Sequence, residues 1–158
     1  MERGFTWIEM LAVLAVLGIL ALIAIPAMQD GVLKRQVKDG MGLATLAEAG
    51  VQASYALSGG KFPLDNKSAG LPDSDKIVGN LVKDVSVSAG AITITFGNNA
   101  SKALDGKKVT LRPAVVPDQP VIPIAWLCHT AGVPKNMEVT GTDNTDVPPK
   151  WLPVECRG

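Results

Sequence analysis

One acidic side chain lies at the edge of a long apolar segment. Glu9 stands between Ile8 and Met10, and the twenty residues from Met10 to Gln29 carry no charge. A carboxylate that enters lipid costs about 2.5–3.5 kcal/mol on insertion scales, so a charge at this place marks a functional site whose partner must be found. The nearby sequence offers only Arg3.

A cut near the N-terminus would supply another partner for this carboxylate. If the chain were cleaved after Gly4, Phe5 would carry a new ammonium group four residues before Glu9. Four residues make about one helical turn, so the amine and the carboxylate would share a helix face. The pair could then close within one chain or between neighbouring chains.

The two cysteines form a second candidate pair. Cys128 and Cys156 belong to a chain with an export-type segment, which predicts one disulfide outside the cytoplasm. The chain-entropy model gives roughly 3.5 kcal/mol of stabilisation for a loop of about 29 residues. Two free buried thiols are the alternative. His129 adjoins Cys128, but a metal site would have the wrong spacing, and a Cys–His nucleophile would need a free thiol.

The remaining polar residues form no catalytic constellation. A P-loop, a paired-histidine zinc motif and a dinucleotide fingerprint are all missing from the sequence. We therefore predict no enzyme activity, no cofactor and no metal. A calcium site at Asp73 and Asp75 is a minor alternative. The sequons that begin at Asn66 and Asn99 are interpreted as chance matches.

Two further features are candidates for surface binding. Lys102, Lys107 and Lys108 cluster around one turn, where a solvated face competes with contact to DNA or another anionic surface. Trp151 is a possible surface contact, although a role in covering the core is favoured. The whole chain carries fifteen basic and fifteen acidic residues, a balance that argues against a general nucleic-acid binder and a disordered polyelectrolyte.

Three interpretations compete for the apolar segment. A twenty-residue helix is about 30 Å long, which matches the hydrocarbon core of a bilayer. A cleaved signal peptide would need a good small-residue cleavage site, and Ile25 and Pro26 before Ala27 make a poor one. A simple membrane anchor leaves Glu9 unexplained. The third interpretation, a helix whose chain is cleaved after Gly4, gives Glu9 an ammonium partner at Phe5.

Periodicity predicts an α+β fold for the whole chain. Apolar residues continue at helical spacing as far as Tyr55. We expect Gly18 and Pro26 to weaken or kink this helix. Gly40 and Gly42 could soften the helix further or allow close packing. Two-residue alternation then predicts four antiparallel strands packed on the helix. Their inward residues are Val85 and Val87; Ile92, Ile94 and Phe96; Val109 and Leu111; and Ile122, Ile124, Trp126 and Cys128.

The N-terminal motif resembles that of a known family. Arg3-Gly4-Phe5-Thr6-Trp7-Ile8-Glu9 is similar to the leader junction of type IV pilins, although that family usually has Leu where Trp7 stands. The resemblance implies cleavage after Gly4 by the prepilin peptidase and N-methylation of Phe5. It also implies that Glu9 pairs with the amine of a neighbouring subunit during assembly.

The C-terminal pattern resembles the same family. Trp126-x-Cys128, followed by Pro149–Pro153 and Cys156, is similar to the disulfide-bounded D-region of type IVa pilins. The segments expected from the resemblance and the periodicity are a leader (1–4), a membrane and assembly helix (5–29), an amphipathic half-helix (30–57), an αβ-loop (58–80), a sheet (81–128) and the D-region (128–158).

The resemblance implies a subunit of a pilus filament. Such a subunit would wait in the bacterial inner membrane, interact with the assembly machinery and polymerise with other pilin subunits, supporting adhesion, twitching motility or DNA uptake. Two alternatives stay open: a low-abundance minor pilin that acts as an adhesin or DNA receptor, and a pseudopilin of type II secretion.

Overall fold

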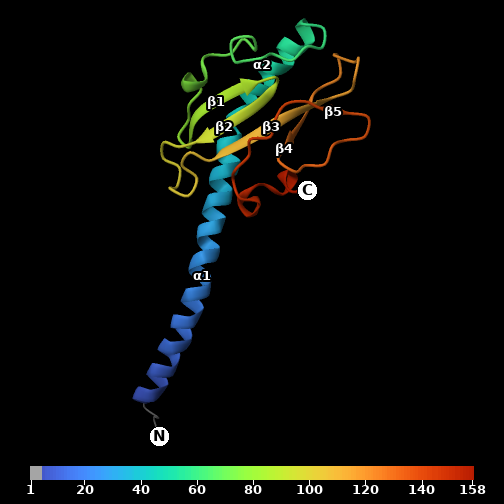
Figure 1. The fold of residues 1–158 in the computed structure, drawn as a ribbon. Coiled ribbons are helices and arrows are strands. Elements are labelled where there is room, and N and C mark those ends of the chain that lie inside the picture. Colours follow the sequence, from blue (N-terminus) through green and yellow to red (C-terminus); the bar gives the residue numbers. More distant parts are fainter. Residues whose placement is uncertain (1–4) are drawn as a thin grey trace. The chain divides into compact units, whose positions relative to one another are not determined.

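The computed structural model describes residues 5–158, apart from the side chains of residues 24–27 (Figure 1). The chain divides between Val32 and Leu33 into two compact units. The leader residue Gly4 lies outside the described residues, and so does the side chain of Pro26.

Helix α1 (Trp7–Met41) is the helix of the first unit, and its last residues, from Leu33 to Met41, belong to the second unit. The apolar side chains of the first unit from Trp7 to Ile23 are exposed: Trp7, for example, is 81% exposed. Among the described residues, this is the one helix that is long and apolar enough to cross a membrane. The helix continues through Gly18, so a loss of helical order there stays a prediction.

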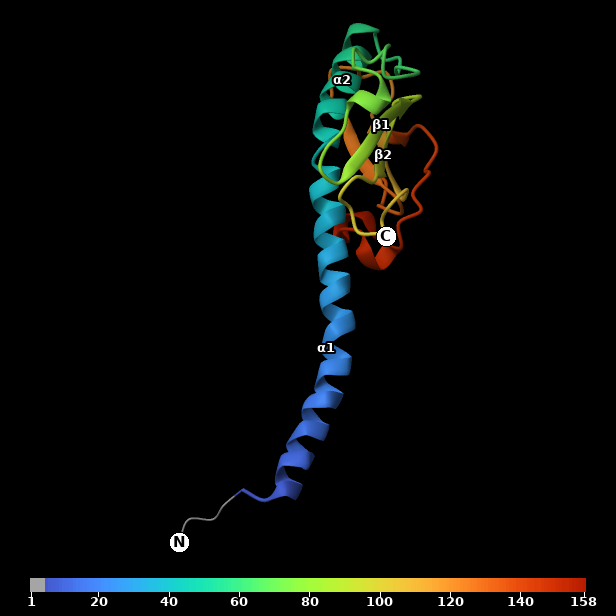
Figure 2. The same ribbon diagram turned by 90° about the vertical axis from the view of Figure 1, so that its left-hand side faces the viewer.

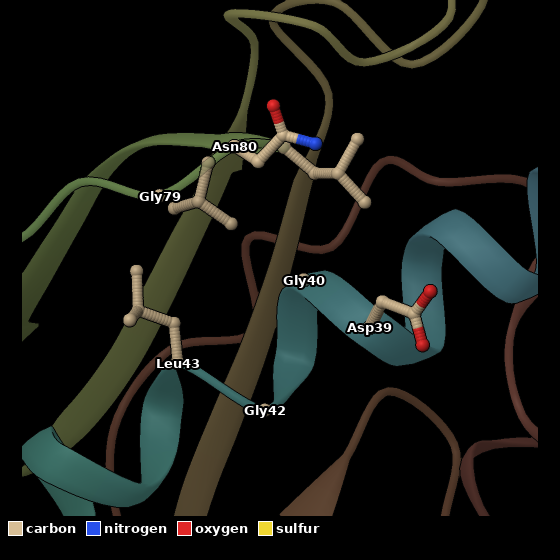
Figure 3. A pocket seen from close by; sticks show the side chains of 8 residues that line it. Asp39, Gly40, Gly42, Leu43, Gly79 and Asn80 are labelled. Carbon is tan, nitrogen blue, oxygen red and sulfur yellow. The ribbon is translucent and has the colours of Figure 1, made fainter.

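The sequence predicted one amphipathic half-helix over residues 30–57. In the structure this segment is divided between two helices. Helix α1 ends at Met41, and α2 (Ala44–Leu57) begins after a turn in which the Leu43 amide donates to the Gly40 carbonyl at 3.2 Å. Figure 3 shows this turn beside Gly79 and Asn80, which precede the first strand. Glycine lacks a Cβ and lowers helix stability, which explains a break where two glycines stand close together.

Gly40 also allows close packing. A Cβ atom at this position would collide with Cε1 of Phe96, whose side chain is fully buried. The Phe96 ring therefore occupies the space that a larger residue on the helix would fill. Both roles considered for this glycine pair are present, with the break at Gly42 and the close approach at Gly40.

The sheet is antiparallel and has the strand order β1-β2-β3-β4, with β5 paired to β3. Its strands are β1 (Val82–Ser88), β2 (Ala91–Phe96), β3 (Lys108–Val115), β4 (Ala125–Cys128) and β5 (Glu138–Val139). The four predicted strands are present, and β5 was not predicted. Ile122 was wrongly placed on the fourth strand, because its amide donates to the Gln119 carbonyl in a turn and Pro123 cannot donate to a ladder.

One face of the sheet packs on the helices. Helix α2 lies against β1 and β2 (Figure 2). Val51 and Tyr55 of α2 join Ile92 and Ile94 of β2 in the core. The apolar side of the predicted alternation therefore faces the core, as an amphipathic helix on a half-buried sheet requires.

The opposite face is covered as well. Thr93 and Thr110 are buried, and their hydroxyl oxygens lie 3.1 Å apart. The Asn144 amide donates to Thr110 Oγ1 at 3.2 Å, and the Thr110 amide donates to Thr145 Oγ1 at 3.0 Å. The C-terminal segment thus satisfies polar groups that the alternation alone would place in water.

The D-region is closed by the predicted disulfide. Cys128 and Cys156 are bonded, and both are buried, so the alternative of two free thiols is wrong. The enclosed segment also contributes to the core, through Val147 and Leu152. Such residues show no period in an irregular segment, so their burial leaves no pattern in the sequence.

His129 ties the D-region together. Its Nδ1 lies 3.1 Å from Oδ2 of Asp143, and its carbonyl accepts a hydrogen bond from Arg112 at 2.9 Å. Burial raises the pKa of Asp143, but hydrogen bonds from Thr145 and the contact with His129 outweigh it, so the pKa lies below its usual value. The folded state therefore favours the ionised carboxylate.

We predict that Gly40→Ala destabilises the fold by about 1–3 kcal/mol, because the added methyl group collides with the buried Phe96 ring. Urea unfolding of the detergent-solubilised chain, followed by near-ultraviolet circular dichroism, measures the change. Gly132→Ala is the matched control, since a Cβ there meets nothing within 4 Å. The control should stay within about 0.5 kcal/mol of the parent. Equal stability of the two variants would contradict the packing role of Gly40.

We also predict an acid-sensitive contribution from Asp143. Because its folded pKa is lowered, the contribution is present above the ordinary value of 3.8 and is lost as the pH falls through the folded pKa. Asp143→Asn should therefore flatten the decline in unfolding free energy between about pH 5 and pH 3. Asp105→Asn, in an exposed turn, is the control. The same acid dependence in parent and Asp143→Asn would disprove the contribution.

Candidate functional site

The carboxylate of Glu9 lies in a hydrogen-bonded helix start. The amide and the hydroxyl of Thr6 both donate to Oε2 of Glu9, each at 2.7 Å. In return, the Glu9 amide donates to the Thr6 hydroxyl at 3.4 Å. This is a capping box, in which the residue before the helix and the third helical residue satisfy each other's free groups.

The helix start accounts for the position of Glu9 in this chain. An acidic side chain in the first turn also interacts favourably with the helix dipole. The sequence analysis did not identify Thr6 as part of the site. Its signal is present, since Thr-x-x-Glu before an apolar run is the sequence signature of a capping box.

The capping box leaves part of the carboxylate open. In the described part of the chain, the recorded hydrogen bonds to this side chain all end on Oε2. An ionised carboxylate has two oxygens and about four acceptor positions. Oε1 of Glu9 can therefore accept a hydrogen bond from an ammonium group while Thr6 keeps Oε2.

The surroundings of this box are apolar and exposed. Phe5 is 70% exposed, and Ile8 and Met10 are also exposed. A Cβ at Gly18 would meet nothing within 4 Å, so packing within the chain does not require glycine there. Large unpaired apolar surfaces mark contacts with lipid or protein. The box thus stands at the head of a helix whose apolar side chains from Trp7 to Ile23 are exposed.

The lysine cluster has mixed charge. Lys102 and Lys108 are exposed, but Asp105 lies on the same turn and Asp146 Oδ1 accepts a hydrogen bond from the Lys108 amide at 2.5 Å. Lys107 is half-buried. DNA binding by these lysines stays a prediction, and the neighbouring carboxylates do not favour it.

Trp151 and the first sequon asparagine, Asn66, are not freely exposed. Trp151 is half-buried, packs against the core and lies under Lys150, whose Nζ is 5.1 Å from the ring centroid. Asn66 is buried, and its amide nitrogen donates to the carbonyls of Pro72 and Val85 at 3.0 Å. That nitrogen holds the αβ-loop on the sheet. Asn99 is exposed.

The loop with the aspartates contains an ion pair. Asp75 pairs with Lys76 at 2.9 Å, and both side chains are exposed. In the described part of the chain, no group of three or more His, Cys, Asp or Glu residues is arranged to hold a metal ion.

Comparison with known proteins follows the two parts of the chain. Residues 1–25 match the prokaryotic N-terminal methylation motif, and residues 35–157 match the family described as pilin (bacterial filament). The first match covers the capping box and most of the apolar run, and the second covers the sheet and the D-region.

Individual relatives match over nearly the whole chain. The chain is 37% identical to the type IV major pilin protein PilE of Neisseria gonorrhoeae, over 99% of this chain and 95% of the relative. It is 36% identical to a fimbrial protein of Neisseria meningitidis, with 99% and 95% coverage. It is 32% identical to the fimbrial protein EcpC of Eikenella corrodens, with 99% and 92% coverage. The chain therefore belongs to the pilin family of bacterial filament proteins.

Proposed function

We propose that the chain is a structural subunit of a type IV pilus, polymerised through its N-terminal helix. The observation that carries the proposal is the open oxygen of Glu9 at the head of an exposed apolar helix, within a match to the N-terminal methylation motif. The relatives named as major pilins favour this role over a low-abundance adhesin, a DNA receptor or a pseudopilin. The subunit has a mechanical role and is not an enzyme.

Maturation supplies the partner of Glu9. Prepilin peptidase cleaves after Gly4 and methylates the new amine of Phe5, which lies next to the capping residue Thr6. The ammonium group of a neighbouring subunit then reaches Oε1 of Glu9. A charge-assisted hydrogen bond of this kind is roughly twice as strong as a neutral one, and more so where water is excluded.

The exposed apolar side chains of the helix suit two environments, the membrane before assembly and the filament afterwards. The segment 5–29 first lies in the inner membrane, with the domain 30–158 outside the cytoplasm, where its disulfide forms. The assembly machinery then transfers the subunit into an extracellular filament, where the same apolar side chains pack against other subunits. Gly18 and Pro26 allow the helix to lose order or kink during this change. The amine–Glu9 pair fixes the register, as single polar pairs do in other apolar helix contacts.

The first test is the mass of the mature chain. We expect a protein that begins at Phe5 and carries one added methyl group, because the motif at residues 1–25 directs both steps. Intact-mass and peptide mass spectrometry of chain from sheared filaments measures it. A mature chain that begins at Met28 would identify an ordinary signal peptide and overturn the proposal.

The second test removes the carboxylate. Glu9→Ala should be processed normally but should not enter filaments, because the neighbouring amine loses its acceptor. Glu138→Ala, an exposed glutamate on β5, is the matched control and should assemble like the parent. Immunoblots of sheared filaments and of membranes compare assembled with unassembled subunit. Incorporation of the Glu9 variant at the parental level would refute the role of this residue.

A further inference from the structure

A cavity of about 400 Å³ lies at one end of the globular unit. Lys34, Arg35 and Lys38 line it from the last turns of α1, and the segment from Leu152 to Arg157 lines it from the D-region. Its volume is within the range of small-molecule sites. All of these residues belong to the unit that begins at Leu33, so the cavity lies within one compact unit of the chain.

The lining is strongly positive. Lys34, Arg35 and Lys38 are exposed, and the described part of the chain holds no ion pair to any of them. Arg157 supplies a fourth cation, held in place where its Nε donates to the Leu152 carbonyl at 3.0 Å. Glu155 is the acidic residue in the lining. Four cations and one carboxylate leave a net charge of three positive, which fits a phosphate group.

The same cavity has an apolar wall. Val154 is 76% exposed beside Pro153, although an apolar side chain gains by leaving water. A free phosphate or an acidic peptide would use the cations and leave this wall in water. A ligand that joins a phosphate to a hydrocarbon portion would use both.

The cations stand close to the end of the apolar segment. Lys34 follows Gln29 by five residues, which span at most about 18 Å when extended and about 8 Å in a helix. The headgroup layer of a bilayer is about 5–8 Å thick on each side. A lipid headgroup is therefore the phosphate that lies nearest to these side chains when the segment 10–29 spans a membrane.

The cations are not explained as signals for membrane orientation. Lys and Arg normally concentrate on the cytoplasmic side of a span. Here Arg3 precedes the apolar segment, whereas three cations follow it within ten residues. The proposed orientation places these three on the outer side, where a bound anion would compensate them.

We propose that this cavity binds the headgroup of an anionic phospholipid while the subunit waits in the membrane. The phosphate contacts Lys34, Arg35 and Lys38, and the glycerol and first methylene groups contact Val154. The inference rests on the proposed membrane-anchored state of the subunit. The bound lipid orients the globular unit on the membrane surface and leaves when the helix is withdrawn.

The test uses the full chain in vesicles. Spin-labelled phosphatidylglycerol and phosphatidylcholine are compared by electron paramagnetic resonance, which measures how strongly each lipid associates with the protein. The parent should select phosphatidylglycerol, and the selectivity should fall at high salt. The triple variant Lys34→Gln/Arg35→Gln/Lys38→Gln should lose it, with roughly five-fold weaker association for each cation removed. Millimolar inorganic phosphate should not displace the lipid.

The matched control is Lys102→Gln/Lys107→Gln/Lys108→Gln, which changes the net charge equally but lies elsewhere on the domain. It should keep the parental selectivity. Equal loss in both triple variants, parental selectivity in the first one, or displacement by inorganic phosphate would each overturn the lipid site. A parent chain that shows no lipid selectivity would also overturn the lipid site. If the first triple variant then fails only in filament incorporation, the three cations serve a neighbouring subunit instead of a lipid.

Membrane insertion is measured in the same vesicles by resistance to alkaline extraction. Insertion without lipid selectivity overturns the lipid site alone. A chain that does not insert overturns the membrane-anchored state as well, so the two failures are distinguishable.

Discussion

A carboxylate in an apolar environment must be paired, and the N-terminal part of this chain is organised around that requirement. Glu9 is held by two donors from Thr6 on one oxygen. The recorded hydrogen bonds leave the second oxygen open. In the proposed assembly this oxygen accepts a hydrogen bond from the processed N-terminus of a neighbouring subunit. The sequence Gly-Phe-Thr-x-x-Glu therefore places a helix cap, an open acceptor and the proposed processing site within six residues.

Within the globular unit, packing holds the C-terminal turns of α1 in place. Phe96 packs where Gly40 has no side chain, and the last turns of α1 thereby become part of the core. On the other face of the sheet, buried threonines bond to the C-terminal segment, and the disulfide closes that segment. Irregular chain thus covers the sheet without forming strands of its own, apart from the short β5.

The predictable features were those with a period or a fixed spacing. Alternation such as Ile92-Thr93-Ile94 indicated strands, and this strand is present. The spacing from Phe5 to Glu9 indicated an assembly site, which stays a prediction. Alternation failed at Ile122, where a turn and a proline interrupt the pattern. It also could not show that the threonine face is covered, because Asn144 and Thr145 come from an irregular segment far along the chain. Contacts of that kind depend on tertiary structure alone.

The divided hydrogen bonding of Glu9 has a kinetic consequence. Suppose that the Glu9 carboxylate had to release one hydrogen-bond donor before it met the next. It would then pass through an unpaired charge in an apolar medium, and that state would slow the addition of each subunit to the filament. Because Thr6 holds one oxygen throughout, an incoming amine only displaces water or adds to a vacant lone pair. In the proposed assembly, the cap is therefore expected to lower the activation barrier for subunit addition, and to lower the barrier for subunit removal equally.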